Sequence, residues 1–391
     1  MGDALFDQGD NQAVLEQASQ EYAKAEHLAR RLIELAPEDK RYQRDLAFIL
    51  QKIGDVRQMI ADWQSATAVY NEAVRIMQTL VASEPANTSW QQGLANATSR
   101  LGQALAGMGD FNSALDQYRA ALDIRTRLVQ SDPHDDLAQS NLATSSRDIA
   151  RLYARRGEFD AALAQYQRAI SIRERLLEKD PSNATWQISL APLFSEVGDI
   201  FKRKGDFTGA LEEYEKAYEL RHQLAIKDPG NTGRQYSFGV ASISIADLLV
   251  TMNQQLDRAV MLYREAIATL DSLRPRYDGL VFRCYNSIGN IFVSQQNFDG
   301  GLTEYRRALG IALGAIEAEP VNDKWRKNLS ESIIKIGELL IAEGRMPEAL
   351  QHYEDALKFA EQVASRHPDS AEWKDLVASL KAQVEALKSN R

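Results

Sequence analysis

The sequence has little of what metal centres and disulfide-linked folds depend on. Its 391 residues include one cysteine and five histidines. A single cysteine excludes a disulfide framework and a thiolate metal cluster, and it is typical of a reducing compartment, so we expect a cytoplasmic protein. No two histidines stand three or four residues apart, which excludes a helical pair of metal ligands.

Long apolar runs are missing as well. No stretch of about 18 apolar residues occurs, so we expect no membrane insertion, and the acidic tail 1–10 has no apolar signal-peptide core. The net charge of −9 argues against general binding to nucleic acid or to anionic membranes. The phosphate-loop, dinucleotide, serine-hydrolase and zinc-protease motifs are all missing, so we expect no cofactor and no enzyme activity.

The chain has a repeat instead. Eight of the ten prolines fall at regular intervals, and the first five are 48 residues apart. These are Pro37, Pro85, Pro133, Pro181, Pro229, Pro275, Pro320 and Pro368. Eight tyrosines follow the same period: Tyr22, Tyr70, Tyr118, Tyr166, Tyr214, Tyr263, Tyr305 and Tyr353. Self-similarity at such a period is typical of a solenoid.

The repeated pattern predicts helices. Each of these tyrosines has alanine or glycine four residues before it and alanine three residues after it. That spacing places the three residues on one helical face. Two residues after each proline stands a helix N-cap residue, with Tyr277 as the exception: Asp39, Asn87, Asp135, Asn183, Asn231, Asn322 and Ser370. No stretch alternates as a strand would, so we predict an all-α fold.

The spacing of Gly102, Ala114, Tyr118 and Ala121 resembles that of the tetratricopeptide repeat, over about residues 11–391. The ordinary repeat has about 34 residues, so each helix here should be about two turns longer. The resemblance implies an α-solenoid, a right-handed superhelix of about seven to eight hairpins whose first helices line a concave groove. Repeats this uniform resemble bacterial arrays of the family.

The repeat also predicts the organisation of the chain. A lone helix in 11–36 and the hairpins that follow form an N-terminal arm, 11–274. The rest, 275–391, continues the array and ends in a lone capping helix. The interval from Tyr263 to Tyr305 is only 42 residues. Two interpretations of this irregularity stay open: a tolerated deletion, or a kink near 253–284. Cys284, inside it, is predicted to be a buried apolar residue.

The resemblance also indicates which first-helix side chains face the groove. For the second to fourth hairpins they are Ser99, Gln103, Ala106, Gly107, Arg147, Arg151, Ala154, Arg155, Ser195, Asp199, Lys202 and Arg203. Arg147, Arg151 and Arg155 are four residues apart and form one stripe, and Lys202 and Arg203 should lie beside it. The stripe is a candidate site for an acidic peptide. In the alternative, the arginines pair with acidic residues of adjacent helices, such as Asp199.

A second candidate site lies in the sixth hairpin. Asn286 and Asn290 resemble the asparagines that clamp a peptide in chaperone-binding repeats, although the lysines of that clamp are absent from this hairpin. The predicted function is a non-enzymatic scaffold that binds a protein or peptide partner. The alternatives are a regulatory module that senses a peptide or ligand, and a scaffold that self-associates through its terminal helices. The apolar stripe of the final helix, which begins at Trp373, most simply packs on the last hairpin.

Overall fold

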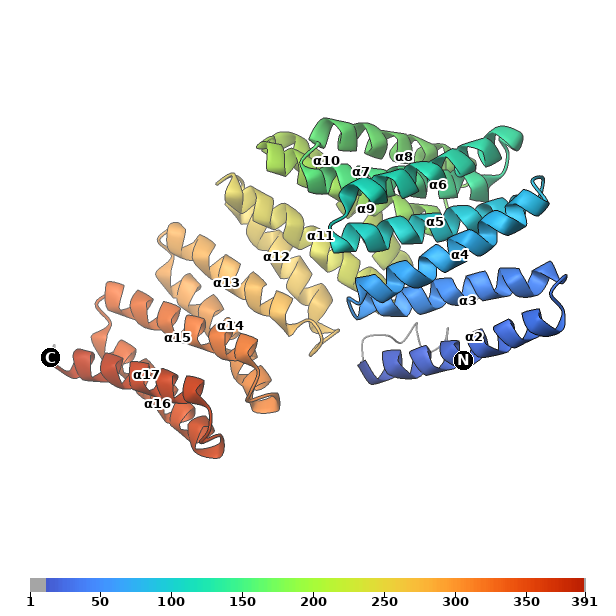
Figure 1. The fold of residues 1–391 in the computed structure, drawn as a ribbon. Helices are drawn as coiled ribbons and strands as arrows, with labels where there is room; N and C mark the ends of the chain where they lie inside the picture. Colours follow the sequence, from blue (N-terminus) through green and yellow to red (C-terminus); the bar gives the residue numbers. More distant parts are fainter. Residues whose placement is uncertain (1–11, 390–391) are drawn as a thin grey trace. The chain divides into compact units, whose positions relative to one another are not determined.

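The computed structural model describes residues 12–389, and every regular element within them is an α-helix (Figure 1). The all-α prediction is therefore confirmed for this part of the chain. The chain divides into two compact units, Met1–Lys204 and Gly205–Arg391, and each is described by itself. The predicted tail, 1–10, lies outside the described residues.

The helices of the first unit are α2 Gln12–Leu35, α3 Lys40–Met59, α4 Trp63–Ser83, α5 Thr88–Met108, α6 Phe111–Ser131, α7 Asp136–Arg156, α8 Phe159–Lys179 and α9 Ala184–Lys204. Those of the second unit are α10 Phe207–Lys227, α11 Thr232–Thr251, α12 Leu256–Asp271, α13 Asp278–Ser294, α14 Phe298–Ala318, α15 Asp323–Ala342, α16 Met346–Arg366 and α17 Ala371–Ser389. Helices α5, α7, α9 and α11 begin 48 residues apart.

Within each unit, helices that follow one another in the chain pack side by side (Figure 1). The packed hairpins are α3/α4, α5/α6 and α7/α8 in the first unit, and α11/α12, α13/α14 and α15/α16 in the second. The first helix of one hairpin also touches the first helix of the next, as α3 touches α5 and α5 touches α7. A row of first helices therefore forms one face of the first unit.

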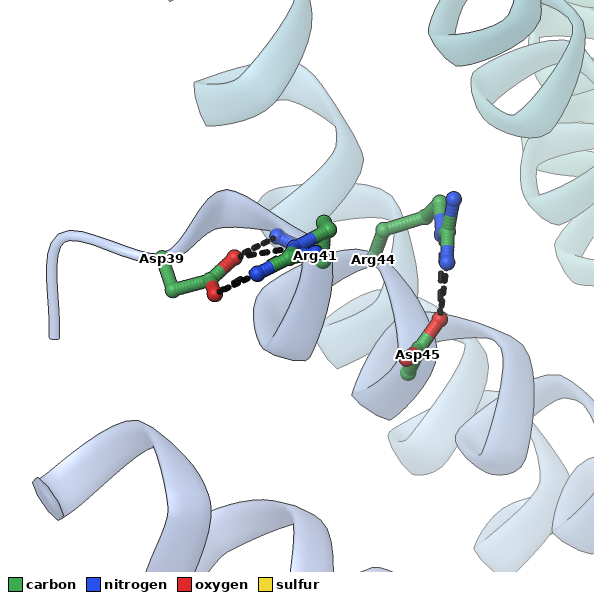
Figure 2. A network of polar contacts seen from close by, with 4 residues as sticks. All are labelled: Asp39, Arg41, Arg44 and Asp45. Carbon is green, nitrogen blue, oxygen red and sulfur yellow. Dashed lines mark hydrogen bonds and ion pairs between the residues drawn. The ribbon is translucent and has the colours of Figure 1, made fainter. Parts of the chain in front are cut away.

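The helix starts are set by the predicted N-cap residues. The Asp39 carboxylate accepts from the backbone N–H of Arg41 at the start of α3 (Figure 2), and Asn87 accepts from that of Trp90. All seven predicted caps accept in this way, and Tyr277 provides no side-chain cap. An N-cap satisfies a donor that the first turn leaves without a partner, which is worth about 1 kcal/mol.

The repeated tyrosines hold the hairpins together. Ala66, Tyr70 and Ala73 are fully buried on one face of α4. A Cβ atom added to Gly54 of α3 would lie 2.4 Å from the Tyr70 ring. Gly289 has the same relation to Tyr305, at 2.5 Å. The missing Cβ is thus what allows the tyrosine ring to lie against the neighbouring helix.

The final helix packs on the last hairpin, as the sequence predicts. Trp373, Leu376, Leu380 and Val384 of α17 are all buried. The indole N–H of Trp373 donates to the carbonyl oxygen of Pro320, at 3.0 Å. Helix α17 therefore covers an apolar face that the array leaves at its end.

The irregular repeat is visible as two short helices. Helix α12 has 16 residues and α13 has 17, whereas α14 has 21. Cys284 is fully buried, and burial raises the pKa of its thiol to about 12, in agreement with an apolar role. The two units divide after Lys204. A kink near 253–284 and a division into arms at 274/275 stay predictions.

The glycine–tyrosine contact gives opposite expectations for the same substitution at two sites of one hairpin. Gly289→Ala places a methyl group against the Tyr305 ring, and we expect a net loss of about 1 to 2 kcal/mol from overpacking. Gly310→Ala, on the exposed face of α14 with nothing near its added Cβ, should stabilise by up to about 1 kcal/mol through helix propensity. Urea unfolding followed by circular dichroism measures both. Equal effects of the two substitutions would contradict the packing role of Gly289.

Candidate functional site

The five predicted basic residues of the first unit lie on two helices. Arg147, Arg151 and Arg155 follow one stripe of α7, and Lys202 and Arg203 lie in the last turn of α9. Side-chain contacts join these helices: the guanidinium of Arg203 donates to the carbonyl oxygen of Ala154, at 2.9 Å. The structure therefore brings the predicted stripe and its neighbours onto one surface of the first unit.

A cavity of about 430 Å³ opens on this surface, and we call it the arginine cavity. Seven of its lining residues were predicted to face the groove: Gln103, Ala106, Arg151, Ala154, Arg155, Asp199 and Arg203. The others are Tyr118, Asp148, Leu152, Tyr166, Glu196 and Ile200. Neither Arg147 nor Lys202 is among the lining residues.

Two arginines of the stripe share one carboxylate. The Nε atom of Arg147 lies 3.0 Å from a carboxylate oxygen of Glu196, and Nη2 of Arg151 lies 3.2 Å from the other. Burial alone would lower the pKa of Arg147, but its hydrogen bonds to Glu196 and the charge of that residue raise it. Pairing with an adjacent helix, the alternative of the sequence analysis, is thus what Arg147 and Arg151 do, and the partner is Glu196.

Arg155 and Arg203 make contacts of another kind. The Arg155 guanidinium lies over the ring of Phe111, 5.0 Å from its centroid, and that of Arg203 lies 4.6 Å from the centroid of Phe159. The two contacts are equivalent in successive repeats. A stacked guanidinium keeps its edge N–H groups for other acceptors. Lys202 is exposed beside them.

The cavity also holds polar groups that the sequence analysis missed. Asp148 is partly buried, and burial raises its pKa to about 6, although the charges of Arg125, Arg147 and Arg151 act in the opposite direction. Burial also raises the pKa of the Tyr118 hydroxyl, and the charge of Asp148 adds to that effect. The position of Tyr118 was predictable from its repeat, but its part in the cavity was not.

Two buried arginines on the second helices interact electrostatically with Asp148 and Arg147. Arg125 of α6 donates to Asn96 Oδ1 at 2.8 Å and to the hydroxyl groups of Ser99 and Ser145. Burial lowers its pKa. One repeat later, Arg173 of α8 donates to the hydroxyl groups of Ser140 and Thr144.

A basic neighbour, Arg147, also affects the pKa of Arg173. Burial, and then the charge of Arg147, lower its pKa to about 10. The hydrogen-bond acceptors of the two buried guanidinium groups are thus neutral oxygens, and Asp148 acts on Arg125 through its charge alone. Burial of a guanidinium without a directly paired carboxylate costs free energy. Their recurrence seven residues after the repeat tyrosine was the sequence signal that could have found them.

The two candidate asparagines of the second unit, Asn286 and Asn290, form hydrogen bonds within the repeat array. Asn286 is buried, donates to the carbonyl oxygen of Phe282 at 3.2 Å, and its Oδ1 lies 3.5 Å from Lys335 Nζ. Asn290 is exposed and accepts from the Tyr305 hydroxyl at 2.7 Å. A role for this pair in clamping a peptide stays a prediction.

Models of the tetratricopeptide repeat family match residues 93–175, 191–223 and 330–369. The first match spans the second and third hairpins and thus contains the whole stripe on α7. This chain is a tetratricopeptide repeat protein. A search of curated proteins found no significant match.

Solved structures show the same fold. The apo form of RapI is similar with a TM-score of 0.58 and 12% identity, over 95% of this chain and 99% of RapI. BtubC from P. vanneervenii is similar with a TM-score of 0.52 and 18% identity, over 67% of this chain and 92% of BtubC. Identities this low carry the likeness of fold alone.

Two searches for other kinds of site gave negative results for the part of the chain that the structure describes. No group of three or more His, Cys, Asp or Glu side chains is placed to hold a metal ion there. No helix there is long and apolar enough to cross a membrane.

The raised pKa of Asp148 predicts a pH-dependent gain in the stability of Asp148→Asn. Because this pKa is higher in the folded chain than in the unfolded one, the ionised carboxylate destabilises the fold. This cost is absent below about pH 4, grows as the pH rises through about 6, and amounts to roughly 2 to 3 kcal/mol above it. The substitution should therefore raise the urea midpoint strongly near pH 8, about half as much near pH 5, and little near pH 4.

The matched change Asp123→Asn removes an acidic side chain from an exposed position of α6 and controls for the loss of a surface charge. A gain from Asp148→Asn of the same size at all three pH values would contradict the burial of an ionisable carboxylate at this place.

Proposed function

We propose that the chain is a non-enzymatic interaction module that binds an acidic segment of a protein or peptide partner in the arginine cavity. The observation that carries this proposal is the cavity itself, where α7 exposes Arg151 and Arg155 and α9 exposes Arg203 around a space of about 430 Å³. A cytoplasmic location stays a prediction.

The charges around α7 favour an anionic ligand. Among the lining residues, three arginines face three carboxylates, those of Asp148, Glu196 and Asp199. Beside them stand Arg147 and the two buried arginines, Arg125 and Arg173. Asp148, with a pKa of about 6, is partly protonated close to neutral pH. The local balance is thus positive, in a chain whose net charge is −9, and it attracts acidic groups.

Arg155 and Arg203 are the residues best placed to receive a carboxylate. Each is stacked on a phenylalanine ring, and Arg203 also donates to a backbone oxygen. A ring holds the guanidinium plane without using its forked N–H groups, which match a carboxylate in a bidentate fashion. Arg147 and Arg151, in contrast, already share Glu196.

The regulatory alternative uses the same cavity, because a peptide-sensing module also has to bind its peptide there. The self-association alternative depends on other residues. On the terminal helix α2, Leu28, Leu32 and Leu35 are exposed by 60%, 40% and 75%. Analytical ultracentrifugation over a range of concentrations tests this alternative. If the chain self-associates through α2, the association should weaken in Leu28→Ser/Leu35→Ser.

Selection from a display library of random dodecapeptides on the immobilised chain tests the proposal. We expect the selected peptides to be rich in aspartate and glutamate. Their affinity, measured by fluorescence anisotropy, should fall about tenfold or more in Arg155→Gln/Arg203→Gln, because each charge-assisted hydrogen bond contributes about 1.5 to 3 kcal/mol.

The control pair is Arg127→Gln/Arg175→Gln, which removes two exposed arginines from equivalent positions of α6 and α8, away from the cavity. Its affinity should equal that of the unchanged chain. Selected peptides without acidic residues, or an equal loss in both pairs, would contradict the proposal.

A further inference from the structure

A second cavity, of about 790 Å³, opens in the first unit among the N-terminal halves of α3, α5 and α7, and we call it the amide cavity. Its lining includes Phe48, Gln51, Gln92, Asn96, Leu137 and Asn141. These first helices have 20 or 21 residues, and the amide cavity lies on the turns that precede the packing glycines. The helices of a repeat of about 34 residues are shorter. The longer helices of this chain therefore provide additional surface to line the cavity.

The two cavities follow the same helical stripes. On α5 the amide cavity is lined by Gln92, Asn96 and Arg100, and the arginine cavity by Gln103. Steps of three and four residues keep these side chains on one face. The same spacing on α7 joins Asn141 to Asp148. At 1.5 Å per residue, the centres of the two cavities lie roughly 15 to 20 Å apart along these helices.

Two apolar side chains line the amide cavity without being buried. Phe48 is 54% exposed and Leu137 is 68% exposed. They come from α3 and α7, the first helices on either side of α5, so the cavity offers apolar surface to a ligand side chain on both of its sides. Burying such a side chain contributes about 1.5 to 3 kcal/mol.

The amides of the cavity offer a donor and an acceptor side by side. Arg125 can only donate, so the Asn96 atom that it meets at 2.8 Å is the oxygen. The same oxygen accepts from Gln92 Nε2 at 2.8 Å. Asn96 therefore keeps its N–H₂ group and Gln92 its oxygen, and this pair matches the C=O and N–H of a peptide group. The buried Arg125 sets the orientation of both amides.

Charged residues of the amide cavity already form ion pairs or hydrogen bonds to the backbone. Arg44 Nη2 lies 2.7 Å from Asp45 Oδ1 (Figure 2), and Arg100 is paired with Asp55. Asp135 accepts from the backbone N–H of Ala138 at the start of α7. This cavity is thus suited to a neutral group, whereas the arginine cavity is suited to an anionic one.

We infer that the first unit recognises an extended peptide at two points, with an apolar side chain in the amide cavity, against Phe48 or Leu137, and an acidic group about five to eight residues away at Arg155 and Arg203. An extended chain advances about 3.3 Å per residue, so about five residues span the cavity centres and about eight span the roughly 27 Å of α7 from Leu137 to Arg155. Gln92 and Asn96 bind the peptide backbone beside the apolar side chain. The inference rests on the proposed function for its acidic point and adds the apolar one.

The peptides selected on the full-length chain test the second point. We expect a leucine, isoleucine, methionine or phenylalanine about five to eight residues from the acidic group. Replacing that residue of the peptide by serine should weaken binding about tenfold or more, because the burial of one side chain is lost. In the variant Phe48→Ser/Leu137→Ser, the original and the serine-substituted peptide should bind equally well, because the change in the protein and the change in the peptide remove the same contact.

The control variant is Ile188→Ser/Ile226→Ser, which removes two exposed apolar side chains that line neither cavity. Circular dichroism checks that each variant is as helical as the unchanged chain. In the control, the serine-substituted peptide should bind about tenfold more weakly than the original, as in the unchanged chain.

The possible failures are distinguishable. Acidic peptides without an apolar preference, or an apolar preference unchanged in Phe48→Ser/Leu137→Ser, would overturn the second point and leave the proposed function intact. Peptides whose binding ignores Arg155→Gln/Arg203→Gln would overturn the proposed function, and the two-point inference with it.

Discussion

The structure depends on the contact between the ring of the repeat tyrosine and a glycine on the facing helix. At Gly54 and Gly289 an added Cβ atom would lie 2.4 and 2.5 Å from the rings of Tyr70 and Tyr305. At these two sites no side chain other than hydrogen fits, so the contact sets how closely the two helices of the hairpin approach. The third and fifth hairpins have the slightly larger Ala150 and Ala246 at the same position. Repeated along the chain, it places the first helices in a row and so creates the surface on which the candidate site lies.

The same contact constrains the residue that follows each glycine. The hydroxyl groups of Tyr70, Tyr263 and Tyr305 donate to Asp55, Asp247 and Asn290, all at this position or its equivalent. A groove residue is thereby tied to the core. In the third hairpin the position holds Arg151, which cannot accept a hydrogen bond. That arginine is free of the tyrosine and pairs with Glu196 on the next first helix. In the third hairpin, which lines the arginine cavity, the groove residue is thus tied to the next first helix and not to its own tyrosine.

The sequence predicted best what repeats and depends on neighbours along one helix. Caps such as Asn87, the face formed by Ala66, Tyr70 and Ala73, and groove positions such as Arg155 follow from spacing alone. Contacts between repeats were not predicted in detail. Glu196 was missed as the partner of Arg147, because which of two acidic residues on α9 is reached depends on side-chain length and helix rotation. Asn290 was chosen by resemblance, whereas its hydrogen bond to Tyr305 follows from the repeat geometry.

The buried arginines connect the fold to the proposed ligand. Arg125 and Arg173 donate to hydroxyl and amide oxygens, which carry only partial charges. The carboxylate of Asp148 offsets the charge of Arg125 in part, whereas the nearby charge of Arg147 adds to that of Arg173. An apolar residue can occupy this position of the repeat, because the buried Met77 stands one period before Arg125. The charge is therefore not needed to form a hairpin. It has two effects at the surface: it raises the potential in the arginine cavity, and through Arg125 it orients Asn96 in the amide cavity. One buried side chain thus acts on both points at which we propose that the partner binds.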